Sequence, residues 1–337
     1  MAFTFGFHES DGADAGDAEP EQGIPLQAAK QINAAQLREL LPEKLSFSPI
    51  EVPFGSSFLR LARRDLFDVR FQLLNDEESA QGVADTHTDL IPGVYEGGLK
   101  TWECSLDLVA TLAERLPSYH AEDASWPSGR HIVELGCGTA VPTCFLFRTL
   151  FSTQPSDRPT VLDLCDYNEE VLSLVVYPNL LLNWFFSAGG PGHGRSVEAG
   201  DLEIDHDLLT QFEQELQARQ IQLRFFSGAW DSLDLSLPGQ SRAEIVLSSE
   251  TVYAIPSLSP LCRVLQDICW PTSSNTSNAS VAAKTTLCLI AAKVLYFGVG
   301  GGVRAFCDAV AARHGWTAAV RENRSGVGRV VLSTGFP

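Results

Sequence analysis

The stretch His131-Ile132-Val133-Glu134-Leu135-Gly136-Cys137-Gly138-Thr139-Ala140 decides the fold class. Its first half is a nearly continuous apolar run, as expected of a parallel strand that is covered on both faces. Two glycines follow the strand, where they permit a tight turn into a helix and a close approach of a ligand to the backbone. The stretch therefore predicts an α/β fold with a small-molecule site beside Gly136 and Gly138.

The residues around the two glycines narrow the choice of ligand. A dinucleotide-binding loop has a further glycine three residues after the second, but this chain has Val141 there. Glu134 adds a carboxylate that is expected to face the loop, which suits a cationic ligand better than a pyrophosphate. S-adenosylmethionine, with a sulfonium, an amino group, a ribose diol and no phosphate, meets these conditions, although Ala140 replaces the third glycine of the usual methyltransferase loop. An ordinary strand-to-helix turn without a ligand is the alternative.

The composition favours a soluble protein with basic partners. The 337 residues include 42 acidic and 24 basic ones, which gives a formal net charge of -18. This charge argues against a nucleic-acid backbone as a direct partner and favours basic proteins or small cations. The N-terminus lacks the basic and apolar regions of a signal peptide, and no run approaches the roughly 18 apolar residues of a membrane span. We expect a protein of the cytoplasm, with the nucleus as the alternative compartment, and no membrane partner.

The eight cysteines are scattered along the chain without a CxxC pair, and several lie inside apolar runs. This spacing does not match the paired ligands of a structural zinc site, and the expected compartment keeps thiols reduced. We therefore expect free cysteines in the core and no metal site.

Composition divides the chain into three parts. Residues 1–25 are acidic, without Lys or Arg, and are expected to form a disordered tail. Residues 26–92 are expected to form an N-terminal extension with a short helix, capped by Asn33, and a β-hairpin. Apolar and polar residues alternate between Phe67 and Leu73 as in a half-buried strand, which places the hairpin turn near residues 64–65. Residues 93–337 form the main domain.

In the main domain, strands and helices alternate, which is typical of a doubly wound sheet. The expected strands are residues 131–135, 160–164, 223–226, 244–248, 286–292, 316–322 and 328–334. The expected helices are residues 105–116, 140–151, 168–184, 203–219, 257–269 and 302–313, and the glycine-rich stretch 187–201 is expected to be a solvated loop. A tight turn at residues 323–326 makes the last two strands antiparallel. The predicted fold class is α/β: a seven-stranded, mostly parallel sheet with one antiparallel strand, the Rossmann-like architecture of class I methyltransferases.

In open α/β sheets, ligands bind beyond the carboxyl ends of the strands. Asp166 follows the second strand, and its carboxylate, which only accepts hydrogen bonds, suits the two ribose hydroxyls of the methyl donor. An N-cap for the next helix is the alternative role of Asp166 or Asn168. Gly228 and Trp230 follow the third strand, where the backbone can approach the adenine and Trp230 can stack on its ring; core packing is the alternative role of Trp230.

Two further segments follow the fourth and fifth strands. Glu250 and Tyr253 form a Glu-x-x-Tyr arrangement at the position where protein methyltransferases of the seven-strand type carry an acidic motif, a weak signal when taken alone. Lys293 comes directly after the fifth strand, and four glycines follow within residues 298–302. Such a run is a poor interior for a helix or strand and indicates unusual dihedral angles or a close backbone contact.

Six segments that follow one another from about residue 94 to the C-terminus are specific when taken together. They are Gly98–Cys104, Glu134–Gly138, Asp166–Asn168, Ser227–Trp230, Ser249–Tyr253 and Tyr296–Gly302. With these segments the chain resembles the eukaryotic protein-histidine methyltransferases that modify a histidine of a large-subunit ribosomal protein, the third of its series. The acidic, Phe-rich N-terminus, Phe3–Phe7, is similar to that of the fungal members.

The resemblance implies S-adenosylmethionine as the cofactor, transfer to the tele nitrogen of an imidazole and a basic ribosomal protein as the partner. We expect a monomeric enzyme. Together with the strand-turn stretch, the resemblance leads us to expect contacts to the methyl donor from Thr101, Trp102, Glu103, Cys104, Ser105, Glu134, Gly136, Gly138, Asp166, Tyr167, Asn168, Gly228, Ala229, Trp230 and Ser249. It places on the substrate side Lys293, Tyr296, Phe297, Gly298, Gly300, Gly301 and Gly302.

The availability of a lone pair separates histidine from lysine as the methyl acceptor. An imidazole with a pKa of about 6.5 is largely neutral at pH 7, whereas a lysine near 10.4 must first lose a proton, at a cost of roughly 4 to 5 kcal/mol. A histidine enzyme therefore needs control of the tautomer more than a base. We hypothesise that Glu250 or a nearby backbone carbonyl accepts a hydrogen bond from one imidazole nitrogen, while Tyr253 packs against the ring. The residues alone leave open a lysine methyltransferase of translation factors or chaperones, and a noncatalytic chaperone of ribosomal proteins.

Overall fold

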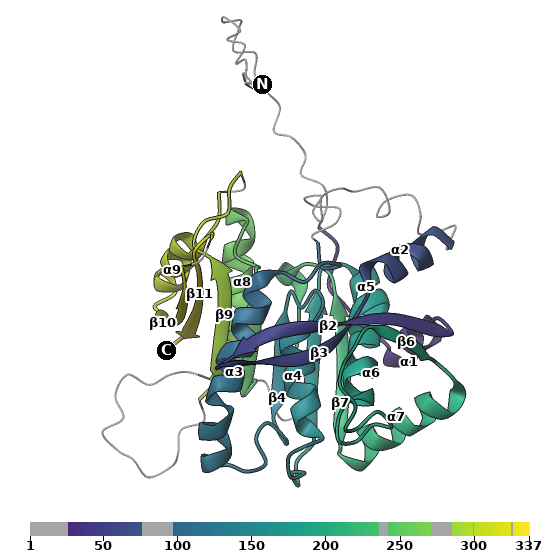
Figure 1. The fold of residues 1–337 in the computed structure, drawn as a ribbon. Helices are drawn as coiled ribbons and strands as arrows, with labels where there is room; N and C mark the ends of the chain where they lie inside the picture. Colours follow the sequence, from purple (N-terminus) through teal and green to yellow (C-terminus); the bar gives the residue numbers. More distant parts are fainter. Residues whose placement is uncertain (1–25, 76–96, 236–241, 271–284, 299, 325) are drawn as a thin grey trace, which may run out of the picture.

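The computed structural model describes residues 26–75, 97–235, 242–270, 285–298, 300–324 and 326–337 (Figure 1). The expected acidic tail, residues 1–25, and the part of the expected extension after residue 75 lie outside the described residues.

A central sheet of eight strands organises the chain, in the order β1-β7-β5-β4-β8-β9-β11-β10 (Figure 1). The strands are β1 (Lys30–Ile32), β4 (His131–Leu135), β5 (Thr160–Asp166), β7 (Ile221–Ser227), β8 (Ile245–Ser249), β9 (Leu287–Lys293), β10 (Trp316–Asn323) and β11 (Arg329–Gly335). The five strands from β7 to β9 are parallel, and β11 runs antiparallel to β9 and β10. Seven of these strands are the predicted class I methyltransferase sheet. The eighth, β1, pairs antiparallel with β7 and comes from the expected N-terminal extension.

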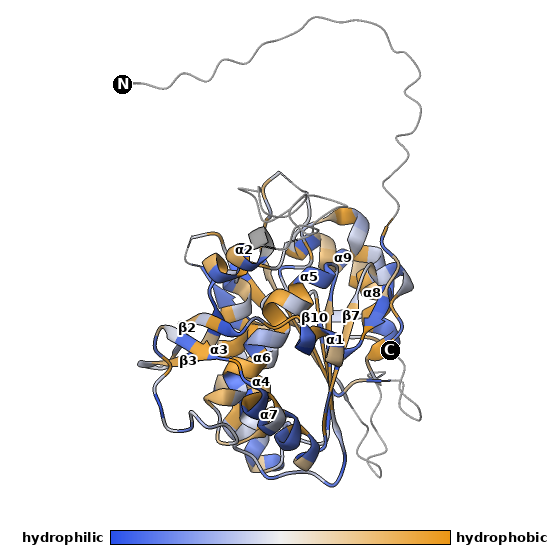
Figure 2. Ribbon diagram, turned by 90° about the vertical axis from the view of Figure 1, so that its right-hand side faces the viewer, coloured by the Kyte–Doolittle hydropathy of each residue, from blue (hydrophilic) through white to orange (hydrophobic). Residues whose placement is uncertain are grey.

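Helices cover both faces of this sheet (Figure 2). They are α1 (Ala34–Glu39), α3 (Glu103–Glu122), α4 (Val141–Leu150), α5 (Glu169–Val171), a π-helical segment (Leu172–Val176), α6 (Tyr177–Phe185), α7 (His206–Ala218), a 3-10 turn (Trp230–Ser232), α8 (Ile255–Ile268) and α9 (Val303–Ala312). α3, α4 and α6 share one core cluster with one face of the sheet, whereas α8 and α9 pack on the other face. Every residue of β4 and β5 is buried, which confirms the interpretation of the apolar run as a strand covered on both sides.

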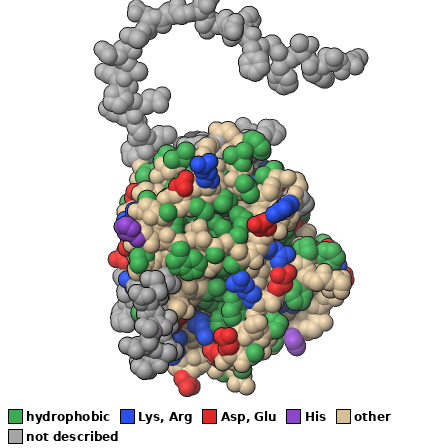
Figure 3. All heavy atoms as spheres, turned by 90° about the vertical axis from the view of Figure 1, so that its left-hand side faces the viewer, with side chains coloured by type: hydrophobic (Ala, Val, Ile, Leu, Met, Phe, Trp, Pro, Cys, Tyr) green, Lys and Arg blue, Asp and Glu red, His purple; other side chains and the backbone are tan. Residues whose placement is uncertain are grey.

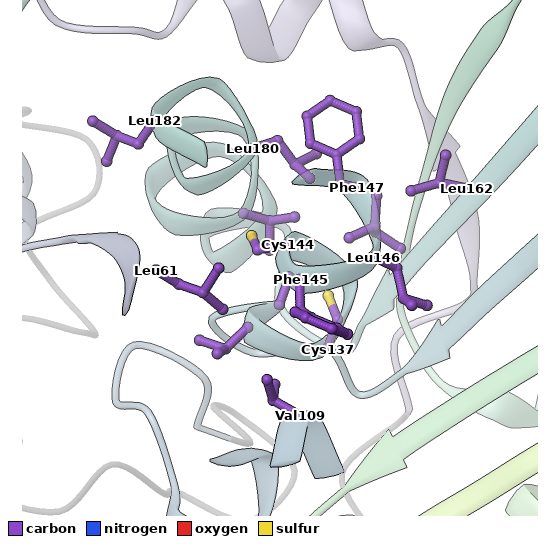
Figure 4. Close-up of a cluster of buried hydrophobic side chains, with 14 of the residues drawn as sticks. Leu61, Val109, Cys137, Cys144, Phe145, Leu146, Phe147, Leu162, Leu180 and Leu182 are labelled. Carbon is purple, nitrogen blue, oxygen red and sulfur yellow. The ribbon is translucent and has the colours of Figure 1, made fainter. Parts of the chain in front are cut away.

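The core beside the glycine turn is built from three layers (Figure 4). Phe147 of α4 and Leu180 of α6 are fully buried together with Leu162 of β5. Leu61, from a strand outside the main sheet, closes the cluster from the far side of the helices. The fixed position of α4 in this packing holds the turn that precedes it.

A second sheet of three strands lies outside α4 and α6 (Figure 1). Its strands are β2 (Lys44–Phe54), β3 (Ser57–Arg64) and β6 (Gly200–Glu203). The side chain of Asn183 in α6 accepts from the backbone N of Ala62 and donates to its carbonyl, at 3.1 and 2.7 Å, so it pairs with the free edge of β3. β6 begins inside the stretch 187–201 that was predicted as a solvated loop, so the end of that loop prediction was wrong. Its pairing with β2 ties this insertion to the N-terminal extension.

The predicted strand between Phe67 and Leu73 was wrong, because these residues lie in helix α2 (Leu66–Asn75). Arg64 is 2% exposed, and its guanidinium donates to Asp68 at 2.7 Å and to Gln72 at 2.8 Å. The side chains at positions 68 and 72 can both reach one guanidinium only when they share a helical face. The expected hairpin exists, but it turns at Gly55 between β2 and β3 instead of near residues 64–65.

Two expectations from the sequence can be compared directly with the structure. The side chain of Asn33 accepts a hydrogen bond from the backbone N of Ala35 at 2.9 Å and caps α1, which confirms the predicted cap. Seven of the eight cysteines are buried, as the apolar runs predicted. Within the described part of the chain, no helix has the length and apolar character needed to cross a bilayer.

Candidate active site

A cavity of about 810 Å³ lies at the carboxyl ends of the parallel strands, where open α/β sheets bind ligands. Of the residues expected from the sequence, it is lined by Trp102, Ser105, Gly136, Gly138, Asp166, Tyr167, Gly228, Ala229, Trp230, Ser249, Glu250, Tyr253, Lys293, Tyr296 and Phe297. The sheet thus brings the loops after five strands and the start of α3 to one place.

The two glycines of the β4–α4 turn form one wall of the cavity. Gly136 and Gly138 have φ angles of 61° and 51°, a left-handed region that favours glycine. A Cβ atom on Gly136 would lie 2.4 Å from Cγ2 of Thr251, which also lines the cavity. Ala140 has a φ angle of 51° as well, so the chain adopts the glycine-like conformation there despite the substitution. The turn therefore presents bare backbone to the cavity, as predicted.

Asp166 lies at the end of β5 and lines the same wall. Its carboxylate accepts hydrogen bonds from the backbone N of Gly138 at 2.9 Å and from that of Asn168 at 3.1 Å. The side-chain N of Asn168 also lies 3.4 Å from Oδ1 of Asp166. A carboxylate only accepts hydrogen bonds, so Asp166 on this wall suits hydroxyl donors. Asn168 does not line the cavity and does not cap α5 with its side chain, which donates instead to the carbonyl of Gly97 at 2.8 Å. Asn168 thus helps to fix the position of the segment at Gly97, which precedes α3.

The wall after β7 is completed by a segment that the sequence analysis did not assign to the site. The backbone N of Ala229 donates to the carbonyl of Gln27 at 2.8 Å, and Leu26 lines the cavity. Gly228 has a φ angle of 106°, and a Cβ atom there would lie 2.6 Å from the carbonyl oxygen of Ala28. Glycine at position 228 is therefore required by the crossing of the N-terminal segment. The N-terminal segment at Ala28 is distant from Gly228 in the sequence, so no local pattern indicated this contact.

Glu250 follows β8 and has a φ angle of 59°, which is unusual for a residue with a side chain. Its Oε1 lies 3.4 Å from Nζ of Lys293 and 3.4 Å from the backbone N of Cys104. Its Oε2 is buried and has no hydrogen-bond partner. A buried carboxylate oxygen without a partner is costly, and strained backbone often marks a functional position. Glu250 lines the cavity, so its carboxylate is the acidic group that a substrate side chain would meet there.

Lys293, which pairs with Oε1 of Glu250, has further partners around the cavity. Its Nζ also lies 3.2 Å from Oε2 of Glu103 and 4.7 Å from the centre of the Trp102 ring. Partial burial disfavours its charge, but the carboxylates of Glu250 and Glu103 raise the pKa of Lys293 on balance. The lysine is therefore a fixed cation that neutralises part of the charge of Glu250.

Two tyrosines lie beside this ion pair. The rings of Tyr253 and Tyr296 meet edge to face, with their centres 6.4 Å apart. Burial and the nearby carboxylate of Glu250 raise the pKa of Tyr296 well above its usual range. Its hydroxyl accepts from the backbone N of Lys293 at 3.2 Å, so Tyr296 stays neutral and fixed.

Several expected residues support the cavity without lining it. Thr101 hydrogen-bonds with Thr139, whose side chain lies on the cavity wall, and Glu103 and Cys104 act on the Lys293–Glu250 pair. The glycines after β9 lie behind the segment of Glu250 and Tyr253. Gly301 donates to the carbonyl of Tyr253 at 2.9 Å, and a Cβ atom on Gly301 would lie 2.1 Å from that oxygen. The remaining expected glycines, none of which lines the cavity, are Gly298, Gly300 and Gly302.

Glu134 does not line the cavity, contrary to the expectation from the sequence. It is fully buried beneath the glycine turn, where it accepts from the backbone N of Thr143 at 3.0 Å in the first turn of α4. Burial raises the pKa of Glu134 to about 8. A strand alternates its side chains between two faces, and Glu134 points to the helix side rather than to the ligand side.

The raised pKa of Glu134 predicts a pH dependence of stability. The carboxyl group of Glu134 binds its proton more tightly in the folded state than in the unfolded state. The free energy of unfolding therefore falls as the pH rises from about 4.5 to about 8. The loss is about 1.4 kcal/mol for each pKa unit. We expect the Glu134→Gln variant to be more stable than the wild type at pH 8 and to differ little at pH 5, as measured by denaturant unfolding at both pH values. An equal difference at both pH values would contradict the assignment.

The cavity fits S-adenosylmethionine. Its volume lies within the usual range of ligand sites and leaves room for a side chain beside the donor. Asp166 can hold ribose hydroxyls, the bare backbone of Gly136 and Gly138 can approach the amino-acid part, and Ala229 and Trp230 can flank the adenine. The carboxylate of Glu250 gives the cavity wall a polar group beside which a methyl acceptor can bind.

The chain is similar to known methyltransferases. No protein-family profile matches the chain. The histidine protein methyltransferase 1 of Schizosaccharomyces pombe is 33% identical over 313 residues, which cover 90% of this chain and 83% of that protein. The histidine protein methyltransferase 1 of Saccharomyces cerevisiae is 30% identical over an alignment 354 positions long, which covers 91% of this chain and 89% of that protein. Among solved structures, the CurJ carbon methyltransferase is similar with a TM-score of 0.39 and 9% identity, over 69% of this chain and 55% of that one.

The two yeast relatives match almost the whole of this chain, including both the N-terminal extension and the main domain. The chain belongs to the histidine protein methyltransferase 1 family and is an enzyme that transfers a methyl group from S-adenosylmethionine to a histidine of a protein.

Proposed function

We propose that the acceptor is a histidine of a large-subunit ribosomal protein, the third of its series, and that the methyl group goes to the tele nitrogen of its imidazole. The net charge of -18 supports a basic protein as the partner. The same charge disfavours direct contact with nucleic acid, so we propose that the enzyme binds its substrate through protein contacts alone. We also propose that the enzyme is a monomer and acts in the cytoplasm or the nucleus.

The observation that carries the proposal is the carboxylate of Glu250 on the cavity wall, whose buried Oε2 has no hydrogen-bond partner. This oxygen can accept the N–H of the imidazole Nδ1, which leaves the lone pair of the tele nitrogen, Nε2, free and directed away from Glu250. Lys293 and the backbone N of Cys104 hold the other oxygen, so the carboxylate does not rotate. Bound S-adenosylmethionine supplies a methyl carbon on a positively charged sulfur, which is open to an in-line attack.

The chain's own residues also favour histidine over lysine. The acceptor site already contains the Lys293 ammonium beside Glu250, and a second ammonium there would be repelled. A neutral imidazole meets no such cost, since its pKa of about 6.5 leaves it uncharged at pH 7. Membership of a histidine methyltransferase family also argues against the two alternatives, a lysine methyltransferase and a noncatalytic chaperone.

The proposal predicts a specific product. Purified enzyme is incubated with radiolabelled S-adenosylmethionine and the separated basic proteins of the large ribosomal subunit, and the labelled protein is hydrolysed for amino-acid analysis. We expect tele-methylhistidine in one large-subunit protein. Label in pros-methylhistidine would overturn the choice of nitrogen, and label in none of these proteins, or in one other than the third of its series, would overturn the proposed substrate. Methyllysine would overturn both.

A further inference from the structure

Large apolar side chains are exposed around the mouth of the cavity. We define the apolar rim as Trp102, Ile255, Leu295, Phe297 and Val327. Their exposed fractions are 39%, 56%, 50%, 78% and 41%, respectively. Four of them line the cavity, and Ile255 lies between the cavity-lining residues Ala254 and Pro256. Figure 3 shows the left-hand side of the molecule of Figure 1, on which hydrophobic and charged side chains are interspersed.

The apolar rim is assembled from four segments that are distant in the sequence. These are the start of α3, the start of α8, the loop after β9 and the turn between β10 and β11. Single exposed apolar residues are ordinary, but a group of them around a cavity is typical of a binding surface.

The most exposed rim residue, Phe297, belongs to the loop after β9, which pairs through its backbone with Tyr253 and Ala254. Gly300 bridges to Ala254, and Gly301 donates to the carbonyl of Tyr253. Gly298, next to Phe297, has open space where a Cβ atom would be, so no neighbouring atom packs there. The loop is thus anchored at its far end, while Phe297 remains exposed at the cavity mouth.

We propose that the apolar rim binds the segment of the substrate protein that flanks the target histidine, and that this segment is itself apolar. The argument rests on the histidine methyltransferase activity, which requires that an imidazole enter the cavity. Neighbouring residues of an extended chain lie about 3.3–3.6 Å apart, so the residues within about three positions of the histidine must lie on the rim. They cover Phe297, Leu295 and Ile255, and apolar side chains gain free energy there by leaving water.

Serine variants of the rim test this proposal. The wild type and the variants Phe297→Ser and Leu295→Ser are compared in methyl transfer to the large-subunit ribosomal proteins. Phe58→Ser is the matched control, because Phe58 is 59% exposed and belongs to the separate three-stranded sheet. We expect each rim variant to raise KM for the protein about tenfold with little change in kcat or in the Kd of S-adenosylhomocysteine, and the control to change nothing.

A peptide series identifies what the rim binds. Histidine-centred peptides that differ only in having valine or serine at the flanking positions are used as acceptors. We expect valine peptides to be the better substrates of the wild type, and Phe297→Ser to abolish most of that preference. An unchanged preference, or a better reaction with the serine peptides, would overturn the proposal.

Other occupants of the rim give different results. If the chain's own residues 2–25 cover the rim, their deletion will lower KM for the wild type but not for Phe297→Ser, which contradicts the proposal. If a second copy covers it, Phe297→Ser will lower the molar mass measured by light scattering, which also contradicts it. Failure of the wild type to label any ribosomal protein would overturn the proposed substrate alone, because the peptide series tests the rim separately.

Discussion

The Glu250→Gln variant is expected to lose about 100-fold in kcat/KM for the protein substrate, while its Kd for S-adenosylhomocysteine stays within about threefold of the wild type. The amide keeps nearly the same shape, but it lacks the charge that draws the imidazole N–H and that pairs with Lys293 at 3.4 Å. The measurement is methyl transfer under initial-rate conditions, together with calorimetry of product binding.

The control for this experiment is Glu322→Gln. Glu322 pairs with Arg324 at the surface, and its side chain is 53% exposed, so its loss should leave kcat/KM unchanged. Normal turnover of Glu250→Gln would show that a backbone carbonyl or another group orients the imidazole. Loss of product binding would instead place Glu250 on the donor side of the cavity.

The Asp166→Asn variant is expected to bind S-adenosylhomocysteine about 100-fold more weakly. Hydrogen bonds to a charged group contribute about 1.5–3 kcal/mol each, and the amide replaces one acceptor oxygen with a donor. Asp166 also accepts from the backbone N atoms of Gly138 and Asn168, so the variant loosens the glycine turn as well. Isothermal titration calorimetry gives the affinity directly.

Asp267→Asn is the matched control, because the Asp267 side chain is 61% exposed and pairs only with Arg263 in α8 among the contacts of the described residues. Its affinity for the product should equal that of the wild type. An Asp166→Asn affinity within about threefold of the wild type would mean that the ribose is held elsewhere, with Asp166 acting only on the turn.

Local patterns predicted the main sheet well because burial of a parallel strand leaves a direct mark on its sequence. β4 and β5 are buried over their whole length, and their apolar runs were sufficient to locate them. The same pattern placed Gly136 and Asp166 at neighbouring strand ends, where they do share a cavity wall.

The N-terminal extension was harder to predict because its segments are stabilised by distant partners. Between Phe67 and Leu73, alternation favoured a strand, but Arg64 binds Asp68 and Gln72 four residues apart and fixes a helix. The strand β2 contains Pro49 and Pro53, which weaken a strand signal although they are tolerated where β2 has no partner on one side.

The sequence by itself determined the alternation of strands and helices, the glycine turn and the identity of the acidic groups near the cavity, because each of these depends on residues close together in the chain. Only the tertiary structure decided which carboxylates line the cavity: Asp166 and Glu250 do, whereas Glu134 lies beneath the turn. It also decided that Lys293 and Cys104 hold Glu250 and that the segment at Ala28 crosses Gly228. These contacts join residues more than 40 positions apart, and the packing of helices on the sheet, which no local pattern specifies, brings them together.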